Sequence, residues 1–166
     1  MKHWQSFLVY LAAFFLQPFL QNLVPVLDGN LNLILCLTVM VVFVSEDPSQ
    51  GIFFGTVFSL LTDMFHSQYT GPGAVAIILC GIVVYFLKYF IHIENFFNAL
   101  FFMAGATVLY GSVYWCIYAA IGTTYSYAYA VSSLLLQIVF NCIAGLCIYF
   151  VCIADLKKNR RDRYYL

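Results

Sequence analysis

The sequence predicts an all-α integral membrane protein: a polytopic helix bundle of about six transmembrane helices with both termini in the cytoplasm. Of its 166 residues, 64% are hydrophobic and only 8% are charged, whereas soluble domains usually carry about 25% charged residues. A water-soluble fold of this composition would leave a large apolar surface in water, so the bilayer is the expected solvent. Aromatic residues make up 19% of the chain, which suits a protein anchored at two membrane interfaces.

Apolar runs separated by turn-forming or polar segments define the expected helices. A span requires about 20 apolar residues, so the second and third runs are short, one of them could be re-entrant, and the count is five or six. Pro18 lies inside the first run and predicts a kink there. The helices form one bundle domain, residues 1–154, and a basic cytoplasmic tail follows at residues 155–166. The expected helices lie at about 5–24, 31–45, 50–66, 73–92, 97–121 and 129–154.

The basic residues predict the orientation of the bundle. With six spans and a cytoplasmic N-terminus, all seven lie at or near the cytoplasmic side, as the positive-inside rule requires. Two of them are Lys2 and Lys88. The tail is expected to anchor the protein on anionic lipid, and docking of an acidic cytoplasmic partner is the alternative. The tail contains the other five: Lys157, Lys158, Arg160, Arg161 and Arg163.

The third expected helix carries small and polar residues at four-residue spacing. Gly51, Gly55, Ser59 and Asp63 therefore lie along one side of the helix. The first two form a GxxxG pair, which lets another backbone approach closely. A carboxylate buried in lipid costs at least ~2.5 kcal/mol, so Asp63 is expected to face the bundle interior, a water-filled pocket or the outer interface. It could end the helix at headgroup level, bind backbone N–H groups of the next turn, or carry a proton or ion.

The segment HSQYTGPG follows directly, and its Gly71, Pro72 and Gly73 predict a tight turn that restarts a helix. A phosphate-binding loop is the alternative for these glycines. It is disfavoured because no P-loop lysine follows and because this turn is expected on the outer side, where nucleotides are scarce. We therefore expect a structural turn.

Amide side chains recur at helical spacing in two of the other helices. Gln17 and Gln21 lie one turn apart in the first helix, and Gln137 and Asn141 do so in the last helix. Inside membranes such side chains bridge neighbouring helices. We expect these four residues to hold helices together, and a pocket for a small ligand is the alternative.

No group of residues suggests catalysis. The three histidines are expected in different regions, and the six cysteines lie in apolar stretches without the spacing of metal ligands. No serine, histidine and acid can be placed together on one side of the membrane. We therefore expect that the chain is not an enzyme, that it holds no metal or other cofactor, and that it binds lipid but no nucleic acid.

The stretch DPSQGIFFGTVFSLLTDMFHSQYTGPGAV resembles the most recognisable segment of the rod shape-determining MreD family. That segment has a proline, a glycine-aromatic-x-x-glycine run, an aspartate eight residues after the second glycine, and a glycine-containing turn. The run DGNLNLILCLTVMVVFV is also similar to the second helix of the family. The GPG turn departs from the more usual Leu-Gly ending. The matching residues here are Pro48, Gly51, Gly55, Asp63, and Gly71 or Gly73.

The resemblance implies a non-enzymatic component of the cell-shape, or elongation, complex in the bacterial plasma membrane. Such proteins bind the membrane-anchored scaffold MreC. They help to couple MreB filaments to peptidoglycan synthesis, in a wider complex with RodA and a transpeptidase. Asp63 would then be an interior contact of the bundle, whose outer surface binds the partner.

The same family is thought to resemble the substrate-binding membrane subunits of energy-coupling-factor vitamin transporters. The alternative function is therefore a six-helix vitamin-capture subunit, with Asp63, Gln68 and the tyrosine-rich segment 125–129 near its outer side. A channel or proton-coupled carrier would require a second intramembrane charge or a polar lining row, and the sequence offers neither.

Overall fold

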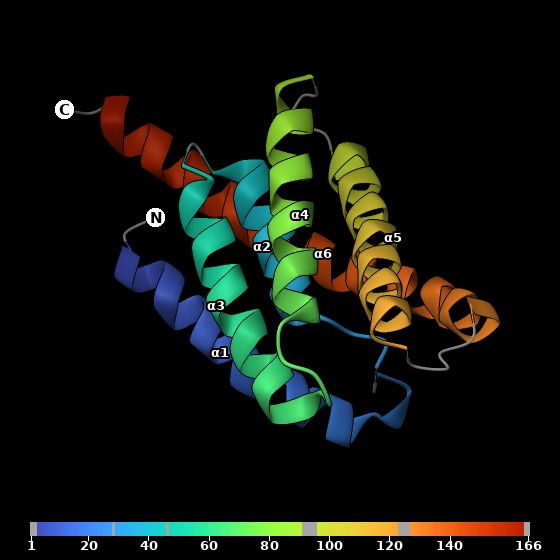
Figure 1. The fold of residues 1–166 in the computed structure, drawn as a ribbon. Coiled ribbons are helices and arrows are strands. Elements are labelled where there is room, and N and C mark those ends of the chain that lie inside the picture. Colours follow the sequence, from blue (N-terminus) through green and yellow to red (C-terminus); the bar gives the residue numbers. More distant parts are fainter. Residues whose placement is uncertain (1–2, 28, 46, 91–95, 123–126, 165–166) are drawn as a thin grey trace.

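The structure, a computed structural model, is a bundle of helices (Figure 1). It describes the backbone of residues 3–27, 29–45, 47–90, 96–122 and 127–164, and side chains from Trp4 to Cys152 except those of residues 127–130 and 132 within these ranges. Over this part of the chain the regular structure is entirely helical, so the all-α prediction is confirmed. The elements are α1 (His3–Leu23), η1 (Pro25–Leu27), α2 (Leu33–Val44), α3 (Ser49–His66), α4 (Pro72–Leu87), η2 (Lys88–Phe90), α5 (Phe96–Ile121) and α6 (Tyr127–Tyr164).

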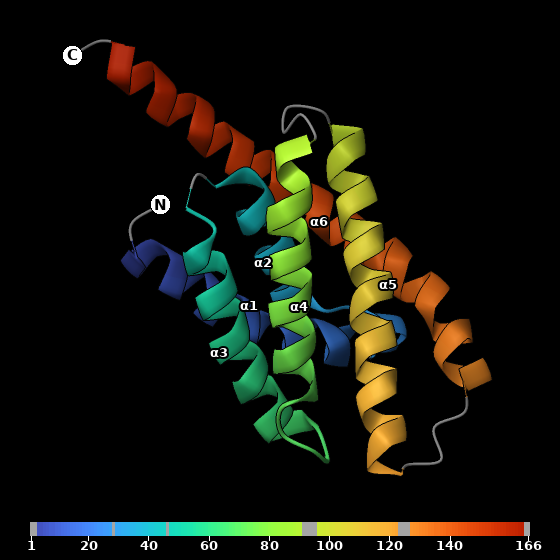
Figure 2. The same cartoon turned by 45° about the horizontal axis from the view of Figure 1, so that its top comes forward.

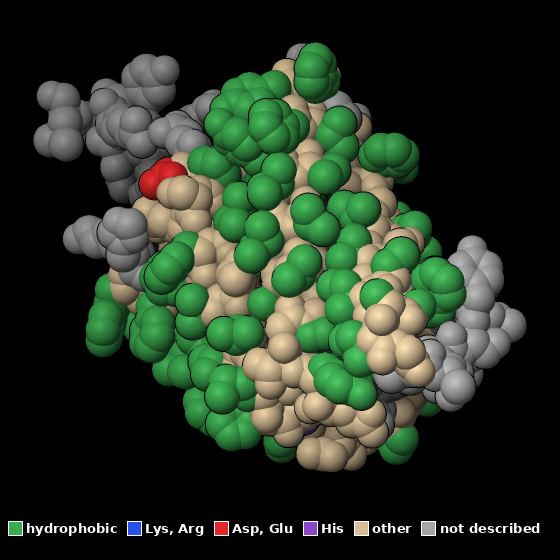
Figure 3. All heavy atoms as spheres, viewed as in Figure 1, with side chains coloured by type: hydrophobic (Ala, Val, Ile, Leu, Met, Phe, Trp, Pro, Cys, Tyr) green, Lys and Arg blue, Asp and Glu red, His purple; other side chains and the backbone are tan. Residues whose placement is uncertain are grey.

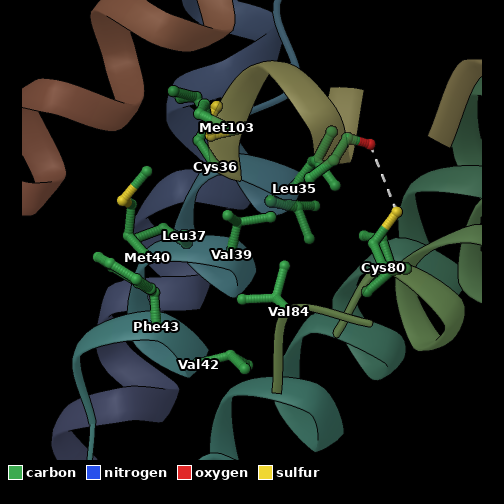
Figure 4. Packing of buried hydrophobic residues seen from close by; sticks show 14 of the residues in the cluster. Leu35, Cys36, Leu37, Val39, Met40, Val42, Phe43, Cys80, Val84 and Met103 are labelled. Carbon is green, nitrogen blue, oxygen red and sulfur yellow. Dashed lines mark hydrogen bonds between the residues drawn. The ribbon is translucent and has the colours of Figure 1, made fainter. Parts of the chain in front are cut away.

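The centre of the bundle is α2. All 12 of its residues are buried, and it packs against each of the other five α-helices. A helix that is apolar on every side is stable only when it is enclosed, and LILCLTVMVVFV meets that condition. Figure 4 shows part of this core, in which side chains of α2 pack among residues of α4 and α5. At 1.5 Å per residue α2 is about 18 Å long.

Successive helices run in alternating directions, as Figures 1 and 2 show. The beginning of α1, the α2–α3 connection and the ends of α4 and α6 lie toward one end of the bundle. The ends of α1, α3 and α5 lie toward the other. The face that carries α3, α4 and α5 is covered mainly by hydrophobic side chains (Figure 3), and large hydrophobic residues are exposed on every α-helix except α2.

Four stretches are long and apolar enough to cross a membrane: Trp4–Leu23, Pro72–Phe90, Phe96–Ile121 and Ser133–Cys152. The length and apolar composition of these stretches support the interpretation of the chain as a membrane protein. The short α2 is apolar but has only 12 residues, less than the ~20 that a complete span needs. The 18-residue α3 is not among the four stretches, and it carries the polar row described above.

The helices begin and end within a few residues of the predicted limits, except at the ends of the fourth and the last. The fourth was predicted to reach residue 92, whereas α4 ends at Leu87 and the short η2 follows it. The last predicted helix stops at residue 154, whereas α6 continues to Tyr164. Residues 155–164, which were predicted as a tail, therefore continue α6 as helix. Pro18 lies within α1, which continues past it to Leu23.

Candidate functional site

The row of small and polar residues on α3 faces the bundle interior. Gly51, Gly55, Ser59 and Asp63 are all buried. A Cβ atom on Gly51 would lie 3.0 Å from Cγ2 of Val42. A Cβ atom on Gly55 would overlap the side chain of Thr38, so the glycine pair is the surface through which α3 contacts α2.

Asp63 binds the beginning of α4. Its Oδ2 atom accepts hydrogen bonds from the backbone N–H groups of Gly71, at 3.1 Å, and Gly73, at 2.8 Å. The first N–H groups of a helix have no partner within the helix, and the helix N-terminus attracts negative charge. The carboxylate is 4% exposed. Its contacts are those of the second interpretation above, in which Asp63 holds the backbone of the next turn.

The turn between α3 and α4 allows this contact because of its two glycines. Gly71 has φ of 119°, a conformation that favours glycine. Pro72 occupies the first helical position, where its missing N–H costs nothing. A Cβ atom on Gly73 would lie 2.6 Å from Oδ1 of Asp63 and 3.0 Å from Oγ of Ser59. The row on α3 and the two turn glycines are therefore one packing unit.

Pro48 and its neighbours form the start of α3. Pro48 is half-buried, and its carbonyl accepts from the N–H of Ile52 at 3.2 Å. The Asp47 side chain accepts from the Ser49 hydroxyl at 2.6 Å. Pro48 thus lies at the end of the packing unit opposite Asp63.

A buried tyrosine, which the sequence did not single out, connects α1 to this unit. The hydroxyl of Tyr10 lies 3.1 Å from the carbonyl oxygen of Gly51 and 3.2 Å from Oγ1 of Thr38. Thr38 donates to the carbonyl of Ile34. Tyr10 is one of 13 tyrosines, and its position in an apolar run gives no sign of a specific partner.

The four amide side chains predicted to bridge helices converge on one segment of backbone. That segment, residues 29–33, leads into α2. Gln17 and Gln21 reach it from α1, and Gln137 and Asn141 reach it from α6. The bonds are Leu33 N–H to Gln17 Oε1 at 3.0 Å, Gln21 Nε2 to Leu31 O at 3.2 Å, Gln137 Nε2 to Gly29 O at 3.2 Å, and Asn32 N–H to Asn141 Oδ1 at 2.9 Å.

Asn141 is the most enclosed of the four, with 2% of its surface exposed. Its Nδ2 group donates to Oγ1 of Thr107 on α5 at 3.3 Å, so one side chain joins α2, α5 and α6. Asn32 itself caps α2, because its Oδ1 atom accepts from the N–H of Leu35 at 3.0 Å. Gln17 and Asn141 therefore accept from N–H groups at the start of the central helix, and Gln21 and Gln137 donate to carbonyls of the segment before it.

Lys88 binds the opposite end of α2. Its Nζ atom donates to the carbonyls of Val42, at 3.1 Å, and Ser45, at 2.9 Å. A cation at a helix C-terminus interacts favourably with the helix dipole. The ammonium also lies within 6.0 Å of the ring centroids of Tyr85 and Tyr89. The sequence indicated only that Lys88 is near the cytoplasmic side, and its role as a cap was missed.

One physical requirement accounts for these contacts. α2, which is about 18 Å long, is enclosed by the other five α-helices, and a backbone group buried without a hydrogen-bond partner costs about 1–3 kcal/mol. Side chains of neighbouring helices provide these partners. Among the described residues, every buried side-chain nitrogen and oxygen atom has a hydrogen-bond partner.

A cleft opens between the last turns of α1 and α3, beside the segment that leads into α2. Two overlapping hollows form it, of about 330 and 280 Å³. The lining is partly polar and includes two of the predicted amide residues. The residues shared by both hollows are Pro18, Gln21 and His66, and Gln17 and Thr62 line the hollow of about 280 Å³.

Some predicted features lie outside the described residues. The side chains of Lys157, Lys158, Arg160, Arg161 and Arg163 are among them, although their backbone belongs to α6. Tyr125 and the side chains of Tyr127 and Tyr129, in the tyrosine-rich segment, also fall outside. Within the described part of the chain, no three histidine, cysteine or acidic residues lie together as metal ligands would.

A comparison of this chain with known protein families, with curated proteins and with solved structures found no match. The resemblance to MreD proteins accordingly depends on the residues quoted above. The geometry adds one relation between those residues, because Gly51, Gly55, Asp63, Gly71 and Gly73 belong to a single packing unit.

Proposed function

We propose that this chain is a non-enzymatic membrane component of the bacterial cell-shape complex. In this proposal it resides in the plasma membrane and binds an MreC-like scaffold. It helps to couple MreB filaments to the peptidoglycan synthases, RodA and a transpeptidase. The bundle acts as a rigid frame, and the outward faces of its helices receive the transmembrane segments of its partners.

The observation that supports this proposal is the structural use of the motif that carries the resemblance. Gly51 and Gly55 allow α3 to pack closely against α2, and Asp63 connects α3 to the start of α4 by two hydrogen bonds. The motif thus holds three helices together, and its carboxylate is bonded to backbone N–H groups. A frame with its polar groups turned inward and its apolar side chains turned outward suits a protein that acts by binding other membrane proteins.

The proposal includes six membrane crossings with both termini in the cytoplasm. Helices that alternate in direction are compatible with this topology. In it, α2 crosses together with the segments on either side of it, because α2 alone is too short to span. Lys88 is at the end of the bundle that also holds the α2–α3 connection, which is the end assigned to the cytoplasm.

The cleft between α1 and α3 favours a second candidate, the substrate-binding subunit of an energy-coupling-factor vitamin transporter. Polar groups that converge in a hollow are typical of small-molecule sites. In the expected topology this cleft opens on the outer side, where such a subunit captures its substrate. Asp63, however, is bonded to the backbone of α4 and does not line the cleft.

An affinity purification separates the two candidates. The tagged chain is isolated from native membranes in mild detergent, and co-purifying proteins are identified by mass spectrometry. Enrichment of an MreC-like protein and wall synthases is expected. Recovery of a transmembrane coupling subunit with paired ATPases, and no wall-synthesis proteins, would refute the shape-complex proposal.

A matched variant connects that experiment to the structure. Gly55→Leu forces a side chain against Thr38 and should reduce recovery of the partners together with stability. Gly105→Leu places the same side chain where a Cβ atom meets nothing within 4 Å. It should leave the stability of the bundle unchanged, so any effect of Gly105→Leu on partner recovery alone would locate a contact on the outer face of α5.

A further inference from the structure

We propose that the cleft between α1 and α3 binds the headgroup of a membrane phospholipid that carries a hydrogen-bond donor, such as phosphatidylglycerol or phosphatidylethanolamine. The proposal is independent of the cell-shape assignment, because it concerns the lipid that surrounds the bundle. It rests on the depth of the cleft, on the hydrogen-bonding groups that line it, and on the apolar side chains beside its mouth.

In the proposed topology, the cleft lies at the level of the lipid headgroups. Gln17, Pro18 and Gln21 lie within the last two turns of α1, which ends at Leu23. Thr62 and His66 lie in the last turns of α3, which ends at His66. Six residues of helix span about 9 Å, so the cleft lies close to the ends of α1 and α3, where the proposed six-span topology places the outer headgroup layer.

The cleft offers donors that suit a phosphate. The Oε1 atom of Gln17 accepts a hydrogen bond from the N–H of Leu33, so the Nε2 group of Gln17 remains available to donate. Asn22 and His66 are exposed and make no hydrogen bond with the described residues. These neutral amides and an imidazole can donate to the oxygen atoms of a phosphodiester, which would otherwise be solvated by water.

The cleft also offers acceptors, and these select among phospholipids. The Nε2 group of Gln21 donates to the carbonyl of Leu31, so the Oε1 atom of Gln21 remains available to accept a hydrogen bond. Pro18 has no N–H, so the carbonyl of Phe14 has no donor four residues later in the helix. Gln21 and Phe14 both line the hollow of about 280 Å³. An ammonium or hydroxyl group can donate to these oxygen atoms, whereas the trimethylammonium of phosphatidylcholine cannot.

Apolar side chains beside the cleft provide surfaces for the acyl chains. Phe19 on α1 and Phe65 on α3 are both well exposed. The ring of Phe14 packs against that of Phe65, with centroids 6.1 Å apart, and this contact joins the two walls. A soluble phosphodiester would use only the polar part of the cleft, so the lipid is the better occupant.

Binding of added lipid to the purified full-length chain in detergent tests the proposal, with native mass spectrometry as the readout. Phosphatidylglycerol should bind, phosphatidylcholine should bind about fivefold more weakly, and glycerophosphoglycerol without acyl chains should not bind. The factor is that of one lost hydrogen bond between the neutral glycerol hydroxyl and a neutral oxygen atom of the cleft. Equal binding of the two lipids would overturn the proposal, and equal binding of glycerophosphoglycerol would assign the cleft to a soluble phosphodiester instead.

Two threonines of α3 provide a matched pair of variants. Thr62 and Thr56 are both half-buried, and each donates to the carbonyl four residues earlier, but only Thr62 lines the cleft. Thr62→Phe should abolish the preference for phosphatidylglycerol, and Thr56→Phe should retain it. His66→Ala alters an exposed residue without hydrogen bonds to the described chain, and it should weaken binding about tenfold. Wild-type binding by both Thr62→Phe and His66→Ala would overturn the assignment.

Discussion

Replacement of Asp63 by alanine should destabilise the bundle by breaking the contact between α3 and the start of α4. The substitution removes the acceptor of two backbone N–H groups, those of Gly71 and Gly73. A buried donor that loses its partner costs about 1–3 kcal/mol. Since water can reach part of the turn, we expect a total loss of about 2–4 kcal/mol in the free energy of unfolding.

Asparagine at the same position separates hydrogen bonding from charge. The side-chain oxygen of Asn can accept from both N–H groups, while the negative charge at the start of α4 is lost. Charge at a helix N-terminus contributes about 0.3–1 kcal/mol. Asp63→Asn should therefore destabilise the bundle by about 1 kcal/mol and retain most of its abundance in the membrane.

The assay is denaturant unfolding of the purified protein in mild detergent, followed by tryptophan fluorescence, together with the amount of each variant in membranes. Gln68→Ala is the control, because Gln68 is exposed in the same turn and makes no hydrogen bond with the described residues. Wild-type stability of Asp63→Ala would refute the reasoning. Equal loss in Asp63→Asn and Asp63→Ala would also refute it, since the charge and not the acceptor would then matter.

Substitutions at three further positions test the remaining contacts by the same unfolding assay. Gly55→Leu should cost about 1–3 kcal/mol or more by overpacking against Thr38; equal stability of this variant and Gly105→Leu would show that α3 does not approach α2 there. Asn141→Leu leaves the N–H of Asn32 without its acceptor and should cost about 1–3 kcal/mol, which an unchanged unfolding midpoint would contradict. Lys88→Met should cost about 1–3 kcal/mol by removing hydrogen bonds from a charged donor, whereas Lys88→Arg should lose less; equal losses would argue against a role for charge.

Features that depend on neighbouring residues could be predicted from the sequence. Apolar runs between turn formers gave the helix limits, and four-residue spacing gave the buried side of α3. The contact between Asp63 and the N–H groups of Gly71 and Gly73 was one of three interpretations, because the acid and the turn are only eight to ten residues apart. The end of α6 was missed, since a run of charged residues suggests a tail although such residues also favour helix.

Partners far apart in the sequence could not be predicted. Spacing shows which side chains share a face of a helix, but it does not show what that face meets. Gln17 and its partner Leu33 are 16 residues apart, while Asn141 and Asn32 are 109 apart. The four amides were therefore expected to join helices, as they do, but the sequence did not show that all four bond to the backbone at the start of α2.

The length of α2 explains why this backbone needs them. A 12-residue apolar helix enclosed by longer ones ends inside the bundle, so its first N–H groups and its last carbonyls require partners from elsewhere. Amide side chains of α1 and α6 accept from N–H groups at its beginning, and Lys88 donates to a carbonyl at its end. A short apolar run in an otherwise membrane-spanning sequence, together with isolated amides in the long runs, therefore indicates a capped central helix. On this argument, the long helices carry polar residues because α2 is short and its ends need hydrogen-bond partners. Extending α2 by one turn at either end would displace the side chains that cap it.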